Sequence, residues 1–296
     1  MARPVAKFLA GFAILAGVLA LTCLILTLRR PLPPSRPLPN PNGYEELVKA
    51  AQMLAGKPWE LSSLSAEELR TLLATNAEAL ALARTGLTHE CWTPMIYSET
   101  NLTFLDGLRV IKALAESFVA EGRLAELDGR PGDAARSYLD AVRVGCAATR
   151  GGMIIHSLVG IACESIGLKP LEKLAPTLDA KSCREAAAGL EAAERQRASA
   201  AAVLAQEHDW ARRSYGFKGQ LIQLITYKSL KKTEQGWKAK LSAHEARARR
   251  LMLDLAIRAY ELEQGQRPKE LAALVPVYLK SIPIDPATGT NMVYQP

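Results

Sequence analysis

Residues 118–142, FVAEGRLAELDGRPGDAARSYLDAV, decide the fold class of this chain. Small residues recur at helical spacing on both sides of the turn signal Asp128-Gly129, together with the large side chains Phe118 and Tyr138. Small side chains let two antiparallel helices approach closely, and aromatic rings fill the groove beside them. The stretch therefore predicts a helical hairpin, joined by a tight turn.

The rest of the chain has the composition of a mainly α protein. Hydrophobic residues make up 49% of the 296 residues, but aromatic residues only 6%. This bias favours helices, because strands are built from β-branched and aromatic residues. Ser65 with Glu68 matches a helix-capping box, and a long helix is predicted from about Phe104 to Leu127. We expect an irregular helical bundle.

The N-terminal segment has the properties of a membrane anchor. Residues 8–28 read FLAGFAILAGVLALTCLILTL, twenty-one residues without a charge. At about 1.5 Å per residue such a helix spans roughly 30 Å, the thickness of the hydrocarbon core of a bilayer. A cleaved signal peptide would have a shorter apolar region, and Thr22 fits poorly before a lipoprotein cysteine at Cys23. We expect an uncleaved transmembrane anchor in residues 1–30, with a signal peptide or a lipoprotein as the alternative.

The charges that flank this helix hardly discriminate its orientation. We expect a single-pass protein of the cell (inner) membrane whose domain lies outside the cytoplasm. Residues 31–42, PLPPSRPLPNPN, contain six prolines and predict an extended spacer of roughly 35 Å. Beyond the spacer we expect an α-helical domain over residues 43–250 and a small C-terminal module over residues 251–296.

The middle of the chain resembles known helical proteins in two respects. The hairpin of residues 118–142 resembles a single tetratricopeptide (TPR) unit through Phe118, Gly122, Ala125, Gly129, Ala134, Tyr138 and Ala141. A lone unit of this kind implies a hairpin within a larger bundle. Residues 43–210, which include LALARTGLTHECW and GRPGDAARSYLDAVRVG, resemble a large uncharacterised family of membrane-anchored helical proteins. That resemblance implies an architecture and no activity.

The tail of the chain, residues 251–296, resembles a segment of the major pseudopilin of type II secretion. In that segment a helix and a Gly-x-x-Pro turn precede a Pro-x-Asp-Pro-x-x-Gly hairpin. The matching residues are Tyr260, Gly265, Pro268, Leu271, Leu274, Pro276, Leu279, Pro283, Asp285, Pro286, Gly289 and Tyr294. A pilin function is not implied, because Ala16 stands where the pseudopilin peptidase site has Glu.

The same tail is interpretable from its residue types. Gly265 suits the end of a helix, and Pro268 suits the first turn of the next. Asp285 begins a turn, which predicts pairing of residues 282–284 with residues 292–294. The tail is therefore expected to form a helix, a turn and a short hairpin.

Glu164 is the most informative candidate site residue. It lies in MIIHSLVGIACESIG, residues 153–167, an apolar helix that is predicted to be buried on most sides. A buried carboxylate needs a partner, and the partners expected are Arg109, Arg123, Arg143 or His156. The alternative is a general acid or base, although no second catalytic group is recognisable near it in the sequence.

Ser229-Leu-Lys-Lys232 matches the pattern Ser-x-x-Lys, which is common by chance and lacks its usual companion motifs here. No stretch of the chain matches a metal site, a Gly-rich phosphate loop or the pattern Gly-x-Ser-x-Gly. We therefore predict no catalytic residue, no cofactor and no metal. The polar clusters His89-Glu90-Cys91 and Glu207-His208-Asp209 lack the spacing of zinc ligands and are interpreted as loop or surface residues.

One segment carries the basic excess of the chain. Between Trp210 and Arg250 there are eleven Lys or Arg and two Glu, a formal charge of +9 against +7 for the whole chain. Residues 212–232, RRSYGFKGQLIQLITYKSLKK, mix these cations with apolar and aromatic side chains, with Trp237 close behind. Such a mixture suits an anionic lipid surface or an acidic partner. The candidate binding residues are Lys228, Lys231 and Lys232. The alternative is the solvated face of a core helix.

Together these features predict a non-enzymatic, membrane-tethered protein-interaction or scaffold protein of the bacterial envelope. Its expected contacts are the membrane, through residues 8–28, and a protein partner. Nucleic acid is not expected, because the domain is placed outside the cytoplasm. The alternative hypothesis is an envelope hydrolase that uses Glu164 as its general acid or base.

Overall fold

The computed structural model describes residues 14–22, 36–56, 64–98, 100–225 and 227–294, without the side chains of residues 217–228. This described part is mainly helical and contains no β-strand. After the helical stretch 14–22, its α-helices are α2 (Gly43–Gln52), α3 (Ala66–Thr75), α4 (Ala77–Gly86), α5 (Asp106–Leu127), α6 (Pro131–Ala147), α7 (Ile154–Leu174), α8 (Ala180–Gln196), α9 (Ala200–Ile225) and α10 (Tyr227–Gln264). Three short 3-10 turns are η2 (Thr103–Leu105), η3 (Ala175–Thr177) and η4 (Leu271–Leu274).

The predicted helical hairpin is formed by α5 and α6. Phe118 and Tyr138 are buried between the helices, with 0% and 2% of their surfaces exposed. Gly122 lies so close to the Tyr138 ring that a Cβ atom at this position would overlap it. Pro131 begins α6, where its missing N–H removes no helical hydrogen bond. The pattern of small and large residues therefore sets the distance between these helices.

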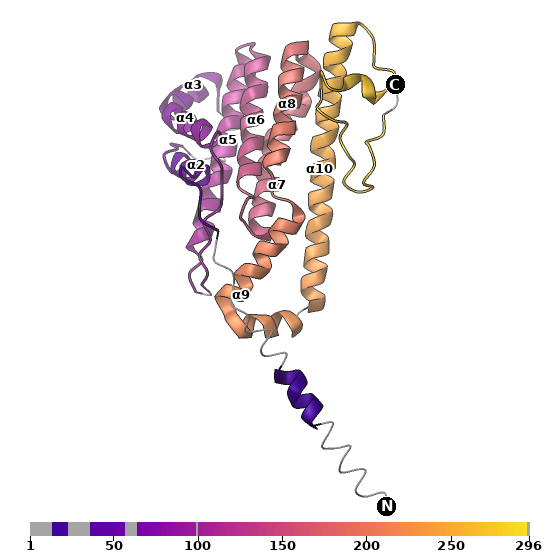
Figure 1. Cartoon of the computed structure of the whole chain (residues 1–296). Coiled ribbons are helices and arrows are strands. Elements are labelled where there is room, and N and C mark those ends of the chain that lie inside the picture. The colour runs from indigo at the N-terminus through magenta and orange to yellow at the C-terminus, as the bar shows by residue number, and fades with distance from the viewer. Residues whose placement is uncertain (1–13, 23–35, 57–63, 99, 226, 295–296) are drawn as a thin grey trace, which may run out of the picture.

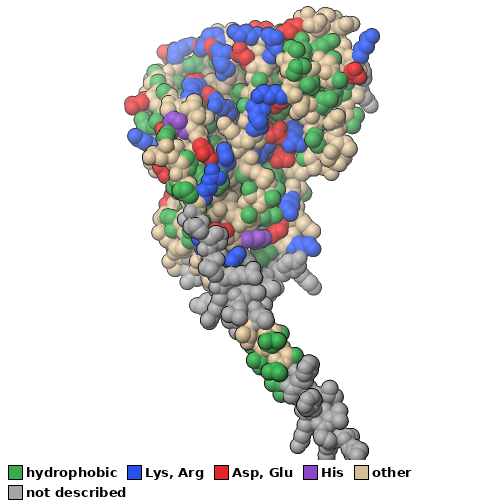
Figure 2. Space-filling view, in the orientation of Figure 1, with side chains coloured by type: hydrophobic (Ala, Val, Ile, Leu, Met, Phe, Trp, Pro, Cys, Tyr) green, Lys and Arg blue, Asp and Glu red, His purple; other side chains and the backbone are tan. Residues whose placement is uncertain are grey.

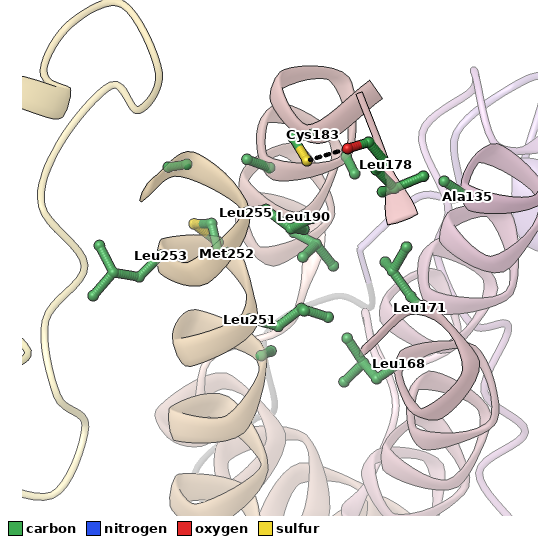
Figure 3. Close-up of a cluster of buried hydrophobic side chains, with 14 of the residues drawn as sticks. Ala135, Leu168, Leu171, Leu178, Cys183, Leu190, Leu251, Met252, Leu253 and Leu255 are labelled. Atoms are coloured by element: carbon green, nitrogen blue, oxygen red, sulfur yellow. Dashed lines mark hydrogen bonds between the residues drawn. The ribbon is translucent and has the colours of Figure 1, made fainter. Parts of the chain in front are cut away.

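Helices α6, α7, α8 and α10 extend the hairpin into a row of packed helices (Figure 1). Helix α6 contacts α5, α7 and α8, and α8 in turn contacts α10. Figure 3 shows the core between these helices, which is built from apolar side chains and a buried thiol: Ala135, Leu168, Leu171, Leu178, Cys183, Leu190, Leu251, Met252, Leu253 and Leu255. Removing this apolar surface from water is the main force that holds the row together.

Helices α2, α3 and α4 cover the other side of α5 (Figure 1). The predicted capping box at the start of α3 is confirmed: the Glu68 carboxylate accepts from the Ser65 N–H at 2.8 Å, and Ser65 Oγ accepts from the Glu68 N–H at 3.3 Å. A second apolar core forms between α2, α4, α5, α6 and α7, around Leu47, Ile111 and Phe118.

The predicted boundary at residues 250 and 251 falls inside α10, which is continuous to Gln264. Ala248 and Leu251 both pack into the core shared with α7 and α8, so the helical part of the tail belongs to the bundle. Gly265 ends the helix with φ +71°, as predicted. The second helix expected after Pro268 is absent, and only the 3-10 turn η4 forms there.

The C-terminal hairpin is looser than predicted. Its turn is closed by the Asp285 N–H, which donates to the Thr290 carbonyl at 2.7 Å. Only one isolated bridge forms, between Ile284 and Asn291, in place of the expected strand pairing. Pro283 and Pro286 lack an N–H, and this loss of ladder donors explains why strands do not extend from the turn.

Helix α7 with η3, Ile154–Thr177, is the one stretch within the described residues that is long and apolar enough to cross a membrane. It lies in the middle of the row of helices and contributes Leu168 and Leu171 to the core (Figure 1). These contacts are those of a core helix. Most of the predicted anchor lies outside the described residues.

Helix α9 breaks at Gly216, which has φ +56° and ψ −135°. Side chains with a Cβ rarely adopt this backbone conformation, so glycine permits the break. Before the break α9 descends from the bundle, and after it the helix turns across the lower end of the bundle towards α10 (Figure 1).

We predict that Gly145→Ala destabilises the domain by about 1–3 kcal/mol, because helices α6 and α7 touch through backbone at this point. A Cβ on Gly145 would lie 2.6 Å from the Gly160 carbonyl oxygen and 2.5 Å from Glu164 Cγ. Gly236 on α10 has no such neighbour within 4 Å, so Gly236→Ala is the matched control. Thermal melts should show a lower Tm for the first variant and a gain of up to about 1 kcal/mol for the control. Equal melting of Gly145→Ala and the parent would contradict the close approach.

Candidate functional site

The centre of α7 holds a buried polar cluster around Glu164. Its carboxylate has 0% exposure and lies next to a close contact between α6 and α7, at Gly145 and Gly160. An arginine and a histidine reach it from distant parts of the chain. The three side chains come from α7, from the corner between α8 and α9, and from α10.

Arg197 supplies the first contact. It follows the last residue of α8, and its extended backbone (ψ 140°) ends the helix. Its Nε donates to Glu164 Oε1 at 3.2 Å, and its Nη2 donates to Oε2, a bidentate arrangement. The side chain is only 5% exposed. Next to it, the Ala198 N–H donates to Thr149 Oγ1 at 2.9 Å, so the corner between α8 and α9 is fixed at two points.

His244 supplies the second contact. Its Nε2 lies 2.9 Å from Glu164 Oε2, and its Nδ1 lies 3.5 Å from Ser165 Oγ. The imidazole is 4% exposed and belongs to α10. The cluster therefore links α7, the corner between α8 and α9, and α10, which are far apart in the sequence.

The electrostatics of the cluster favour an ionised carboxylate. Burial would raise the pKa of the Glu164 carboxyl, but the Arg197 charge and the hydrogen bonds from His244 and Arg197 outweigh burial and hold the pKa below its usual value. A carboxylate that is ionised, hydrogen-bonded through both oxygens and shielded from solvent cannot contact a substrate. The geometry is that of a structural ion pair, and it gives the hydrolase hypothesis no support.

The partners found are not those expected from the sequence. Arg143 binds Asp140, and Arg109 lies at the surface near Asp106. His156 is also buried, but it does not join Glu164: its Nδ1 accepts from the Met153 N–H at 3.1 Å. The expectation of a Glu164–His156 contact is therefore wrong, because the two residues are eight positions apart on α7, about 12 Å along its axis, and have different partners.

His156 is itself an unusual group. Its side chain is 0% exposed, its ring stacks on Phe104 with centroids 6.0 Å apart, and its Nε2 has no hydrogen-bond partner. Burial lowers the pKa of this imidazole to about 4. The ring is therefore a neutral packing element at the start of α7.

The basic segment is only partly described by the structure. Lys231 and Lys232 are exposed near the start of α10, and the side chain of Lys228 is outside the described part. Trp237, grouped with this surface by the sequence pattern, is instead 3% exposed, and its Nε1 donates to Ser157 Oγ at 3.0 Å. Trp237 is thus a core residue.

A groove of about 670 Å³ lies along α5, α6 and the start of α8. The charged side chains that line it are Arg84, Arg130, Arg136, Arg143, Glu121, Asp133, Asp140 and Glu185. They are paired with one another: Arg84 Nε donates to Asp140 Oδ2 at 2.8 Å, and Arg136 lies 3.5 Å from Glu185. Leu73, Leu124 and Leu139 supply apolar surface between them. Basic and acidic side chains also alternate over the face of the bundle seen in Figure 2.

The polar clusters singled out in the sequence have structural partners. His89 Nδ1 lies 2.6 Å from Glu46, and Glu207 accepts from the Ile154 N–H at the start of α7. Among the described residues, no group of three or more His, Cys, Asp or Glu side chains is arranged to hold a metal ion.

Comparison of the chain with models of protein families, with curated proteins and with solved structures finds no match.

We predict that Glu164→Ala destabilises the domain by about 3–5 kcal/mol, because it takes away the bidentate partner of the buried Arg197 guanidinium and leaves only Glu194 and Glu245, each at 3.9 Å. Glu164→Gln should cost less, since the amide keeps the shape of the side chain. Glu172 is the matched control on the same helix: its pair with Arg247 is partly exposed, so Glu172→Ala should cost at most about 1 kcal/mol. Urea unfolding measures all three. A Gln variant more stable than the parent would refute the structural role.

We predict that the free energy of unfolding falls as the pH is lowered from 6.5 towards 4. In this range the His156 imidazole is protonated in the unfolded chain but stays neutral in the folded protein. The loss should reach about 3 kcal/mol. Asn does not titrate in this range. Between neutral pH and pH 4 the His156→Asn variant should therefore lose about 3 kcal/mol less of its free energy of unfolding than the parent, as measured by urea titrations. Any contribution from Glu164 is common to both proteins, so it cancels from the comparison. Identical pH slopes for variant and parent would contradict the assignment.

Proposed function

We propose that the protein is a non-enzymatic, membrane-tethered scaffold of the bacterial envelope that binds a protein partner along the groove beside α5, α6 and α8. The observation that carries the proposal is the lining of this groove. Four arginines and four acids are already paired there, between leucines, on side chains whose exposure ranges from 11% for Asp140 to 61% for Arg136. A reaction centre needs unpaired, oriented groups, whereas a protein partner that carries both charges can exchange such surface pairs at little cost.

The architecture of the hairpin supports an interaction module. The Gly122–Tyr138 contact and the buried Ala134 and Ala141 agree with the TPR-like pattern at residues 118–142. The groove lies against the side of this hairpin that also meets α8. These contacts favour a TPR-like hairpin that presents a charged groove to a protein partner.

The N-terminal stretch supports the membrane tether. In the described residues 14–22 the large side chains are exposed, from 56% for Val18 to 68% for Ile14. These apolar side chains stand clear of the bundle in Figure 2. An isolated apolar helix with no packed face suits a bilayer. We infer a single-pass inner-membrane protein with its bundle outside the cytoplasm.

We predict that a photo-crosslinker placed at Ser182, in the groove, gives a discrete adduct with a partner protein in native cells. Replacing both Arg136 and Glu185 by Ala should reduce this adduct about five-fold or more, because hydrogen bonds to charged groups contribute about 1.5–3 kcal/mol in an interface. The matched control removes the exposed Asp106–Arg109 pair of α5, and it should leave the adduct unchanged. An adduct that is insensitive to the groove variant, or a crosslinker at residue 109 that gives the same adduct, would refute the proposed surface.

A further inference from the structure

A second hollow, of about 530 Å³, lies where the C-terminal tail meets α10. One side of this α10 hollow is a stripe of the helix that carries Arg250, Asp254 and Arg258. These residues follow one another at intervals of four, so their side chains leave the helix on the same face. The volume lies within the range of about 300–1,000 Å³ that is usual for sites that bind small molecules.

The tail forms the other side of the α10 hollow. Figure 1 shows the tail returning beside α10. Arg250 Nη1 donates to the Val293 carbonyl at 3.2 Å. The Tyr294 hydroxyl donates to the Pro268 carbonyl at 2.7 Å. Val293 and Tyr294 both line the hollow, so its second side is held in place by hydrogen bonds.

Two arginines of the stripe have no carboxylate partner. Arg250 donates to a carbonyl of the tail, and Arg258 Nε donates to the Leu178 carbonyl at 3.3 Å. Neither guanidinium forms an ion pair with a carboxylate in the part of the chain that the structure describes. By contrast, Arg247 on the same helix donates to both oxygens of Glu172 at 2.6 Å. The hollow thus holds two positive charges that no ion pair neutralises.

A third guanidinium reaches the α10 hollow from the tail. Arg267 Nε donates to Glu261 Oε1, and both side chains line the hollow. Asp254, midway between the two arginines of the stripe, is exposed and forms no hydrogen bond within the described residues. The lining therefore carries three cations against two carboxylates, and one of these carboxylates is free to accept a hydrogen bond.

This set of groups suits a ligand with oxyanions. A guanidinium presents five N–H donors in one plane, in a geometry that matches the oxygens of carboxylate and phosphate. The carbonyls that Arg250 and Arg258 now bind are neutral, so an anion in the hollow would add the counter-charge that both side chains lack. Asp254 would repel an oxyanion at its own position but would accept from a hydroxyl or amino group there.

We propose that the α10 hollow binds a small molecule that carries phosphate or carboxylate groups. Arg250 and Arg258 bind its oxyanions, and Arg267 adds a third cation from the tail. Asp254 accepts a hydrogen bond from a hydroxyl or amino group of the same molecule. Because the ligand contacts both α10 and the tail, its binding joins the tail to the bundle. This inference depends neither on the proposed membrane tether nor on the proposed protein-binding groove.

The test uses the full-length protein in a non-ionic detergent at physiological salt. Isothermal titration calorimetry is carried out with pyrophosphate and, separately, with citrate. We expect at least one of the two anions to bind with a Kd below about 1 mM. The tighter of the two identifies phosphate or carboxylate as the preferred group. If neither anion binds with a Kd below about 10 mM, the proposal is overturned.

Replacing both Arg250 and Arg258 by Gln should weaken binding about ten-fold or more, because charge-assisted hydrogen bonds to the anion are lost. The matched control replaces Arg70 and Arg109, which lie on α3 and α5, by Gln. It removes the same net charge and should leave the affinity unchanged. Equal weakening in both double variants would mean attraction by net charge alone and would contradict the site.

Arg267→Gln is a second variant that keeps the test valid if the double variant folds poorly. Its side chain is 62% exposed and belongs to the tail, so its loss leaves the packing of α10 intact. This variant should also bind the anion more weakly than the parent. An unchanged affinity would exclude the tail from the site.

Modification of arginines by phenylglyoxal, mapped by mass spectrometry, locates the bound anion. Arg250 and Arg109 are both exposed, so both should react in the free protein. A saturating concentration of the anion that binds should protect Arg250 and leave Arg109 reactive. Binding that leaves Arg250 as reactive as in the free protein would place the anion elsewhere and would refute the α10 hollow as its site.

Discussion

The desolvated carboxylate of Glu164 is the constraint on which the arrangement of the helices depends. A buried charge is tolerated only when opposite charges and hydrogen bonds replace the water that it loses. Arg197 and His244 meet this need, and they can do so only if the corner between α8 and α9 and the middle of α10 both lie against α7. Apolar packing holds these helices together, but it would tolerate sliding or rotation. The bidentate contact does not, because guanidinium and carboxylate must face each other in one geometry.

The position of this cluster explains how the path of the chain from α8 into α9 is fixed. Arg197 fixes the point at which the chain leaves α8 and enters α9, and the contacts of Trp210 then carry α9 to Gly216 in a defined direction. On the other side of the row, the hairpin of α5 and α6 leaves a charged groove open. In the proposed function the flank of the bundle meets a protein, and no reactive group is required for this contact.

Local patterns in the sequence predict the local structure well. The hairpin at residues 118–142 and the capping box at Ser65 depend on neighbours within a few residues, so their residue types suffice. The need of Glu164 for a partner was likewise foreseeable, but the partner was not, since Arg197 is 33 residues away and His244 is 80. A signal for His244 does exist: it continues the apolar face of α10 marked by Trp237, Leu241, Ala248 and Leu251. Trp237 lies on the same apolar face, which explains why it is a core residue. In the tail, Pro283 and Pro286 prevent the strand pairing that the residue pattern predicts.

The central claim is that Glu164 and Arg197 stabilise the fold only as a pair, and a double-mutant cycle tests it most directly. Glu164→Met and Arg197→Met would each be measured alone and together by urea unfolding. Each single variant leaves one buried charge without its partner, whereas the double variant replaces the pair by apolar side chains of similar size, which is often nearly neutral. We expect the double variant to be more stable than either single variant, with a coupling of about 3 kcal/mol or more. If the two single costs add to within about 0.5 kcal/mol, the residues act independently and the claim is contradicted.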